Sequence, residues 1–168
     1  SSGLFLAEHI LKKASNHNEL LSKIKTPKTW YITSDALLNF MSYNNLDEVM
    51  EQKYKEIGQV RQEYPYVIHV FKNSLHSPEI VKGLLMALED LGDVPLVIRS
   101  SSLLEDRVGA VFAGKYKSLF IANQGSKEKR LNELTDAIAE VYASTFGPDP
   151  IEYRTHNDLL DFHEEMGI

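Results

Sequence analysis

Residues 95–106 read PLVIRSSSLLED, and this stretch decides the fold that we expect. Its first four residues form a short apolar run, which is typical of a buried strand. The strand ends at Arg99, and the hydroxyl side chains of Ser100, Ser101 and Ser102 follow at once. A permanently charged guanidinium beside several hydroxyl donors suits the binding of a polyphosphate. The stretch therefore indicates a strand that delivers ligand-binding groups at its end.

A glycine-bounded loop follows a few residues later. Residues 109–114 read GAVFAG, with Phe112 as the one aromatic side chain. Glycine lets a backbone approach a ligand closely, and the N–H groups of such loops can bind phosphate oxygens. With Arg99 close by, the two stretches predict a nucleotide-handling domain. The alternative for the loop alone is a simple β-turn between strands.

The composition is that of an ordinary globular domain. The 168 residues are 43% hydrophobic and 25% charged, which is sufficient for one buried core. The formal net charge of −6 argues against nucleic acid or an anionic membrane surface as the main partner. The chain contains no cysteine, which excludes disulfides and thiolate sites, and we expect a cytoplasmic protein. No apolar run is long enough to cross a membrane.

Alternating helix and strand patterns predict a mixed α/β domain. Ser77 and Pro78 mark the start of one helix and Gly92 its end, since these residue types are typical of helix termini. We expect helices over residues 4–14, 18–24, 36–43, 46–64, 78–91 and 127–146, and strands over residues 30–33, 66–71, 94–99 and 116–121.

Three patches of the chain resemble one protein family, the pyruvate phosphate dikinase and phosphoenolpyruvate synthase family, in its amino-terminal nucleotide-binding domain. Residues 98–116 resemble the family pattern V-R-S-S-A-x-x-E-D-x-x-x-x-S-F-A-G-Q-Y/F. Residues 26–33 resemble its proline-led strand, V-P-x-G-F-x-I-T. Residues 137–144 resemble its helix ending A-I-x-x-x-x-A-S, and Tyr153 and Arg154 match the A-x-x-Y-R that follows.

This resemblance implies an ATP-grasp-like amino-terminal subdomain with a mixed sheet flanked by helices. We interpret residues 1–168 as part of that nucleotide-binding domain, within a larger phosphotransferase. The larger protein would move phosphate from ATP through a phosphohistidine to pyruvate or a related acceptor. Its phosphohistidine and acceptor-binding domains, and the ligands of Mg²⁺, are expected outside this chain, which alone is expected to be inactive. Similar domains are also fused to rifampicin- or glucan-phosphorylating modules.

Arg99 is the residue to which the resemblance assigns the central role. It would contact ATP and neutralise phosphate oxygens as charge shifts during transfer. The alternative is a strand-end arginine that pairs with a carboxylate. Ser100 and Ser101 would donate to phosphate, or would cap the segment that follows the strand.

The acidic pair Glu105 and Asp106 is expected in the nucleotide site without binding a metal. Adjacent side chains on a regular element point in different directions, which makes a shared ion unfavourable. We expect one of the two carboxylates to orient Arg99 or a loop amide.

The glycine-bounded loop would lie over the triphosphate, with Phe112 as its apolar anchor. Gly109 and Gly114 bound the loop, and Phe112, Ala113 and Gly114 match the family pattern. The family usually has alanine, serine and glutamine where this chain has Ser102, Val111 and Lys115.

Two further alternatives remain open. The whole chain could be a non-catalytic nucleotide-sensing or scaffold module that retains the fold. Arg154 could reach nucleotide or pair with Asp158, and we favour a structural role for it. The aromatic residues Trp30, Tyr31 and Phe40 are expected in the core.

Overall fold

The computed structural model describes residues 2–15, 23–102, 116–160 and 166–168. The chain divides into two compact units, Ser1–Trp30 and Tyr31–Ile168. The first unit contains helix α1 (Ser2–Ala14), which confirms the helix expected over residues 4–14. An ion pair between Lys12 and Glu8, 2.9 Å long, joins successive turns of this helix. The helix expected over residues 18–24 falls mostly outside the described residues.

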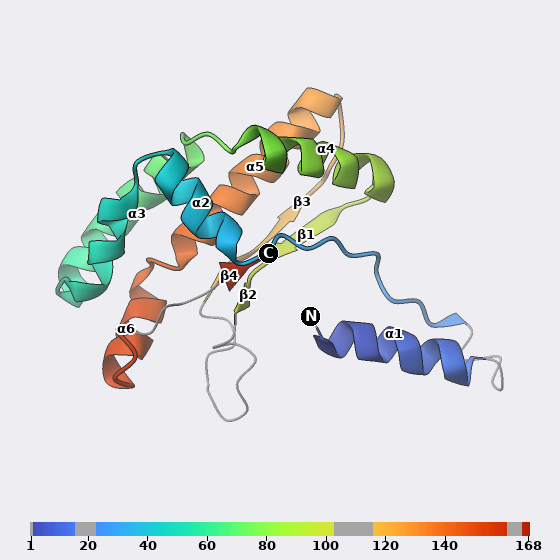
Figure 1. The fold of residues 1–168 in the computed structure, drawn as a ribbon, viewed down its shortest axis with the longest axis horizontal. Coiled ribbons are helices and arrows are strands. Elements are labelled where there is room, and N and C mark those ends of the chain that lie inside the picture. The colour runs from blue at the N-terminus through green and yellow to red at the C-terminus, as the bar shows by residue number, and fades with distance from the viewer. Residues whose placement is uncertain (1, 16–22, 103–115, 161–165) are drawn as a thin grey trace. The chain divides into compact units, whose positions relative to one another are not determined.

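The second unit is a mixed α/β domain, as expected (Figure 1). Ser77 caps the N-terminus of helix α4 (Pro78–Leu91) with its side chain, and Gly92 follows the last residue of this helix with a φ of 72°. Both predicted ends of the helix are therefore confirmed. The helices of the second unit in chain order are α2 (Asp35–Tyr43), the 3₁₀ helix η2 (Asp47–Tyr54), α3 (Ile57–Lys72), α4 (Pro78–Leu91), α5 (Lys127–Ser144) and α6 (Pro148–His156).

Helix α5 lies at the centre of this unit and packs against α3, α4 and the strands (Figure 1). Its 18 residues follow a 3.6-residue apolar period, and the side chains of Leu134, Ile138, Val141 and Tyr142 are buried. The Tyr142 ring lies 5.5 Å from the ring of Phe40 on α2, measured between centroids. The core therefore forms where α2, α3 and α4 meet α5.

Strands β1 (Leu96–Arg99) and β3 (Ser118–Ile121) form an antiparallel pair that confirms two expected strands. Successive side chains of a strand point to opposite faces. The inner face carries Ile98, which is buried, and its partner Leu119. The outer face carries the cross-strand pair Val97 and Phe120, which are 48% and 82% exposed.

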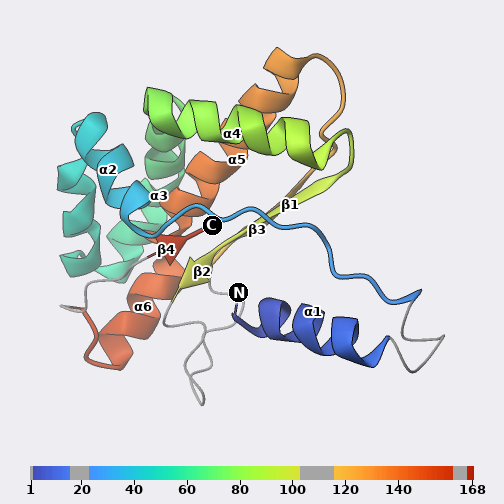
Figure 2. The ribbon, with the colours of Figure 1, turned by 45° about the vertical axis from the view of Figure 1, so that its right-hand side comes forward.

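Two very short strands continue the structure beyond Arg99. Strand β2 (Ser101–Ser102) pairs antiparallel with β4 (Met166–Gly167), and Figure 2 shows β4 beside β2. On the other side of β4, Ile168 exchanges two backbone hydrogen bonds with Ile32, 2.6 and 3.1 Å long. Both described sheets are antiparallel, where a mixed sheet was expected.

The strand expected over residues 66–71 is wrong, because these residues belong to α3. Val67, Ile68 and Val70 are β-branched and favour a strand locally. In the structure Val60, Val67 and Phe71 are buried, at spacings that place them on one helical face, and Pro65 is accommodated within the helix. Packing of this face against α5 overrides the local preference. The long helix expected over residues 46–64 is likewise divided between η2 and α3.

Two other expectations near the ends of the unit are corrected. Residues 30–33 form no assigned strand, and only Ile32 makes the strand-like hydrogen bonds to Ile168. Trp30 and Tyr31 are exposed, whereas Phe40 is buried as expected. The helix expected over residues 127–146 ends at Ser144, and α6 begins at Pro148, because proline is well tolerated in the first turn of a helix.

A buried polar cluster joins β3 to the turn that precedes β1. The amide of Asn123, which is fully buried with a φ of 54°, donates to the carbonyl oxygens of Gly92 and Val94, both at 2.8 Å. Its oxygen accepts a 2.8 Å bond from Nε of Arg130, whose Nη2 donates to the carbonyls of Leu88 and Gly92. These bonds satisfy the carbonyls at the end of α4 and fix the entry to β1.

We predict that Asn123→Ala lowers the free energy of unfolding by about 2 to 4 kcal/mol. The substitution removes the donor to the Val94 carbonyl and the acceptor of Nε of Arg130, whereas the Gly92 carbonyl keeps its bond from Nη2 of Arg130. Each group that loses its partner costs roughly 1 to 3 kcal/mol. Denaturant unfolding of the chain measures the change. The neighbouring Gln124→Ala, which removes one exposed 2.8 Å bond to the Asp93 carbonyl, is the control and should cost less than about 0.5 kcal/mol. Equal losses in the two variants would contradict the assignment.

The half-buried His76 makes the stability of this unit depend on pH. Its ring lies 4.9 Å from that of Phe40, and its Nε2 lies 3.2 Å from the Thr135 carbonyl. Burial lowers the pKa of His76, and this prevails over the opposing effects of the Thr135 carbonyl and Asp136. The unfolded chain, with a histidine pKa of about 6.5, therefore binds more protons below that pH, and acid favours unfolding.

We predict that His76→Gln weakens this pH dependence. The wild-type chain should lose more unfolding free energy between pH 7.5 and pH 5 than the variant, which has no titrating ring at this position. Denaturant titrations at the two pH values measure the difference. His69→Gln makes the same replacement at an exposed site on α3 and is the control for the substitution itself. An unchanged slope in His76→Gln would exclude this histidine as the source.

Candidate functional site

Arg99 occupies the last position of β1, on the outer face of the β1–β3 pair. Its register partner is Ser118, and the next pair along the same face is Val97 and Phe120. The side chain of Arg99 is exposed, whereas that of its neighbour Ile98 is buried at 4% exposure. Strand alternation thus holds the backbone of Arg99 against the core while its guanidinium faces outward.

The arginines of the described residues differ sharply in their contacts. Arg61 pairs with Glu152 at 3.3 Å, and Arg130 pairs with Asp93 at 2.9 Å. Arg154 is buried, donates to the carbonyls of Pro150 and Thr145, and has its pKa lowered to about 10 by burial. Among the described residues, the Arg99 side chain has no hydrogen-bond or ion-pair partner.

This comparison separates the arginines that have partners within the unit from Arg99. The contacts of Arg154 support the structural role that we favoured for it, with backbone carbonyls as its partners. The expected alternative for Arg99, a pair with a carboxylate, is not found within residues 2–15, 23–102, 116–160 and 166–168. Its planar group of donors is therefore directed toward solvent, where an anionic ligand can reach it.

The serines that follow Arg99 lie at the junction of β1 and β2. Ser100 and Ser101 are half-buried, and Ser101 is paired in register with Gly167. Ser102, where the related pattern has alanine, is 3% exposed and pairs with Met166. A small side chain suits this buried position. The structure therefore places Arg99, Ser100 and Ser101 together at one strand end. The buried Ser102 follows them and pairs with Met166.

Six expected site residues lie outside the described residues, namely Glu105, Asp106, Gly109, Phe112, Ala113 and Gly114. The chain is described again from Tyr116, which is 5% exposed. Beside it, the backbone N–H of Lys117 donates to Oγ of Ser144 at 3.3 Å, and its Nζ lies 2.6 Å from Glu140. Residues 103–115 are therefore bounded by Ser102 and Tyr116, both held in the core of the same unit.

The sequence reasoning missed the exposed pair next to Arg99. Val97 and Phe120 lie opposite each other on the outer face, although both were expected simply as strand residues. The alternation of Val97 with Ile98 and Arg99 could have indicated that Val97 shares a face with the arginine. The outer face of the pair therefore presents an apolar patch beside a guanidinium.

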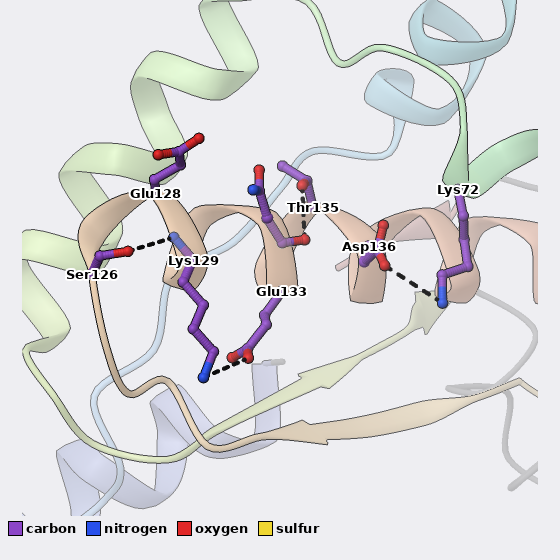
Figure 3. Close-up of a pocket in the computed structure, with 8 residues that line it drawn as sticks. Lys72, Ser126, Glu128, Lys129, Glu133, Thr135 and Asp136 are labelled. Carbon is purple, nitrogen blue, oxygen red and sulfur yellow. Dashed lines mark hydrogen bonds and ion pairs between the residues drawn. The ribbon is translucent and has the colours of Figure 1, made fainter.

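A separate pocket beside α5 is lined by lysines that are paired with carboxylates, unlike the strand end at Arg99 (Figure 3). Figure 3 shows Lys129 pointing to Glu133 and Lys72 pointing to Asp136, and these pairs are 3.7 and 3.6 Å apart. The charges of both lysines are therefore offset locally, and Arg99 does not line the pocket. The lining residues are Lys72, Ser126, Glu128, Lys129, Asn132, Glu133, Thr135 and Asp136.

Neither a metal centre nor a membrane segment is found in the part of the chain that the structure describes. Its His, Asp and Glu side chains form no group of three that could hold a metal ion. None of its helices is both long and apolar enough to span a bilayer. The candidate site is thus the strand end at Arg99, and its groups suit an anion.

Comparison with known proteins identifies the family of the chain. A search of the curated proteins found no match to the chain. The sequence model of one family, described as the pyruvate phosphate dikinase AMP/ATP-binding domain, matches residues 11–168, which include β1, β3 and the candidate site. The match covers nearly the whole chain, and the chain therefore belongs to the pyruvate phosphate dikinase AMP/ATP-binding domain family.

Proposed function

We propose that this chain is the ATP-binding portion of a cytoplasmic dikinase-like phosphotransferase, and that Arg99 contacts the phosphates of ATP. The supporting observation is the exposed guanidinium at the end of β1, which has no partner among the described residues. Membership of an AMP/ATP-binding domain family supports nucleotide as the ligand. In this proposal residues 1–168 form the amino-terminal part of an ATP-grasp domain.

Arg99 would act through charge and geometry. A guanidinium presents parallel N–H donors that match two oxygens of one phosphate group. Because β1 fixes its backbone through the ladder to β3, little ordering of the chain is needed when ATP binds. As the phosphoryl group leaves ADP, negative charge shifts between its oxygens, and a fixed cation stabilises that transition state. Ser100 and Ser101 would add hydroxyl donors at the same strand end.

The phosphoryl group would pass from ATP to a histidine of another domain, and then to pyruvate or a related acceptor. Positioning and electrostatic stabilisation dominate such transfers, so the strand end contributes no nucleophile of its own. The described residues do not provide a magnesium site, and we assign none of them to Mg²⁺. The ion that accompanies ATP would be held by the phosphates and by residues beyond the described ones.

We predict that Arg99→Ala slows phosphorylation of the histidine domain in the full-length protein by about a hundredfold, or about 3 kcal/mol. Arg99→Lys should restore little, because lysine keeps the charge but loses the two-pronged donor. Single-turnover transfer from labelled ATP measures the rate. Thermal melting should be nearly unchanged, since no described residue forms a hydrogen bond or ion pair with the guanidinium.

Arg61→Ala is the matched control for this experiment. Arg61 is also exposed but pairs with Glu152, and its loss should leave transfer unchanged. Normal transfer in Arg99→Ala with a sharply lowered melting temperature would make Arg99 a structural residue. ATP binding without any transfer in the wild-type protein would favour a nucleotide-sensing module.

We predict that the isolated chain binds Mg·ATP more weakly than the low-micromolar range, which corresponds to about −8 kcal/mol. The proposal assigns most of the remaining phosphate and metal ligands to segments outside residues 1–168. Isothermal titration calorimetry tests the affinity directly. Low-micromolar binding, or release of phosphate from ATP by the chain alone, would show that the division of the site is wrong.

A further inference from the structure

Gly167 lies in a crowded position near the candidate site. A Cβ atom added at Gly167 would lie 3.0 Å from the carbonyl oxygen of Ile32 and 3.5 Å from that of Ser101. Both neighbours are backbone atoms, which cannot rotate away as a flexible side chain can. By contrast, a Cβ added at Gly58 or Gly83 would meet nothing within 4 Å. Gly167 thus allows β4 to lie closer to the backbone of Ile32 than a residue with a side chain would, while the Ser101 backbone lies at contact distance on the other side.

The residues before and after Gly167, Met166 and Ile168, fix the position of its backbone. Met166 is fully buried, and its sulfur accepts a hydrogen bond from Oγ1 of Thr145 at 3.2 Å. Ile168 makes its two backbone hydrogen bonds to Ile32. The tight contact of an added methyl group is the one with Ile32, since its distance from the Ser101 carbonyl is an ordinary van der Waals contact. Because Ile32 is hydrogen-bonded to Ile168, we expect relief of this contact to press β4 toward β2, where Ser101 already lies at contact distance.

The segment at Ser101 leads directly to the candidate site. Ser101 is the register partner of Gly167 and lies two residues after Arg99. The backbone between them is short and extended, since β1 ends at Arg99 and β2 begins at Ser101. A displacement of Ser101 is therefore transmitted to the end of β1, where the direction of the guanidinium is set.

We propose that Gly167 is a positioning residue for the nucleotide site, acting through Ser101 on Arg99. This inference rests on the proposed function, in which Arg99 contacts the phosphates of ATP. Gly167 does not touch the nucleotide. It sets the separation between β4 and β2, and this separation fixes where the guanidinium stands.

The test is a double-mutant cycle in the full-length protein, with the dissociation constant for ATP as the readout. Gly167→Ala should weaken ATP binding about tenfold. In the Arg99→Ala background the same substitution should have almost no further effect, because the group through which it acts is gone. A purely structural role would instead give the same loss in both backgrounds. Gly83→Ala, an unhindered substitution within α4, is the matched control and should leave ATP binding unchanged.

The outcomes separate the two proposals. If Arg99→Ala itself leaves ATP binding unchanged, the proposed site at Arg99 fails. If Arg99→Ala weakens binding but Gly167→Ala has no effect, or has an equal effect in both backgrounds, the inference about Gly167 is overturned.

A second variant covers the case in which Gly167→Ala does not fold. Thr145→Val removes the hydrogen bond to Met166 and loosens the anchor of β4 without adding any atom beside Ser101. It should weaken ATP binding about threefold, again only when Arg99 is present. Unchanged ATP binding in Thr145→Val would then overturn the inference.

Discussion

Burial of one face of α5 is the constraint on which the rest of the Tyr31–Ile168 unit depends. The apolar side chains along this helix meet α3 and α4, while its C-terminal half approaches Phe40 of α2. The same helix covers the inner face of the β1–β3 pair. A strand pair with only one face covered must present its alternate side chains outward. The exposure of Arg99 is therefore a direct consequence of how α5 packs.

The partners of the described arginines distinguish Arg99 from the others. Arg61 and Arg130 pair with carboxylates, and Arg154 donates to backbone carbonyls inside the unit. A guanidinium whose N–H donors already bind such partners has fewer donors available for a ligand. Arg99 differs because none of the described residues pairs with its side chain. Its place at the end of a paired strand combines a fixed backbone with an accessible charge, which is the combination that phosphate recognition requires.

The site is also shaped by residues far from it in sequence. The short segment after Arg99 is held by β4, and β4 in turn is held by Ile32 and by the buried Met166. Three stretches from the beginning, middle and end of the unit therefore meet at one point. Close approach at that point requires the absence of a side chain at Gly167. This packing places the strand end that carries Arg99 beside a residue that has no side chain.

Local signals in the sequence determined much of this protein. The apolar run before Arg99 predicted β1, the terminal residues Ser77 and Gly92 predicted both ends of α4, and the motif around Arg99 indicated the family. These features depend on side chains within a few residues of one another. The tertiary structure alone decided that residues 66–71 join α3, because burial against α5 outweighs the strand preference of β-branched residues. It alone also decided the pairing of Ser101 with Gly167, since contacts between distant segments leave no local pattern in the sequence.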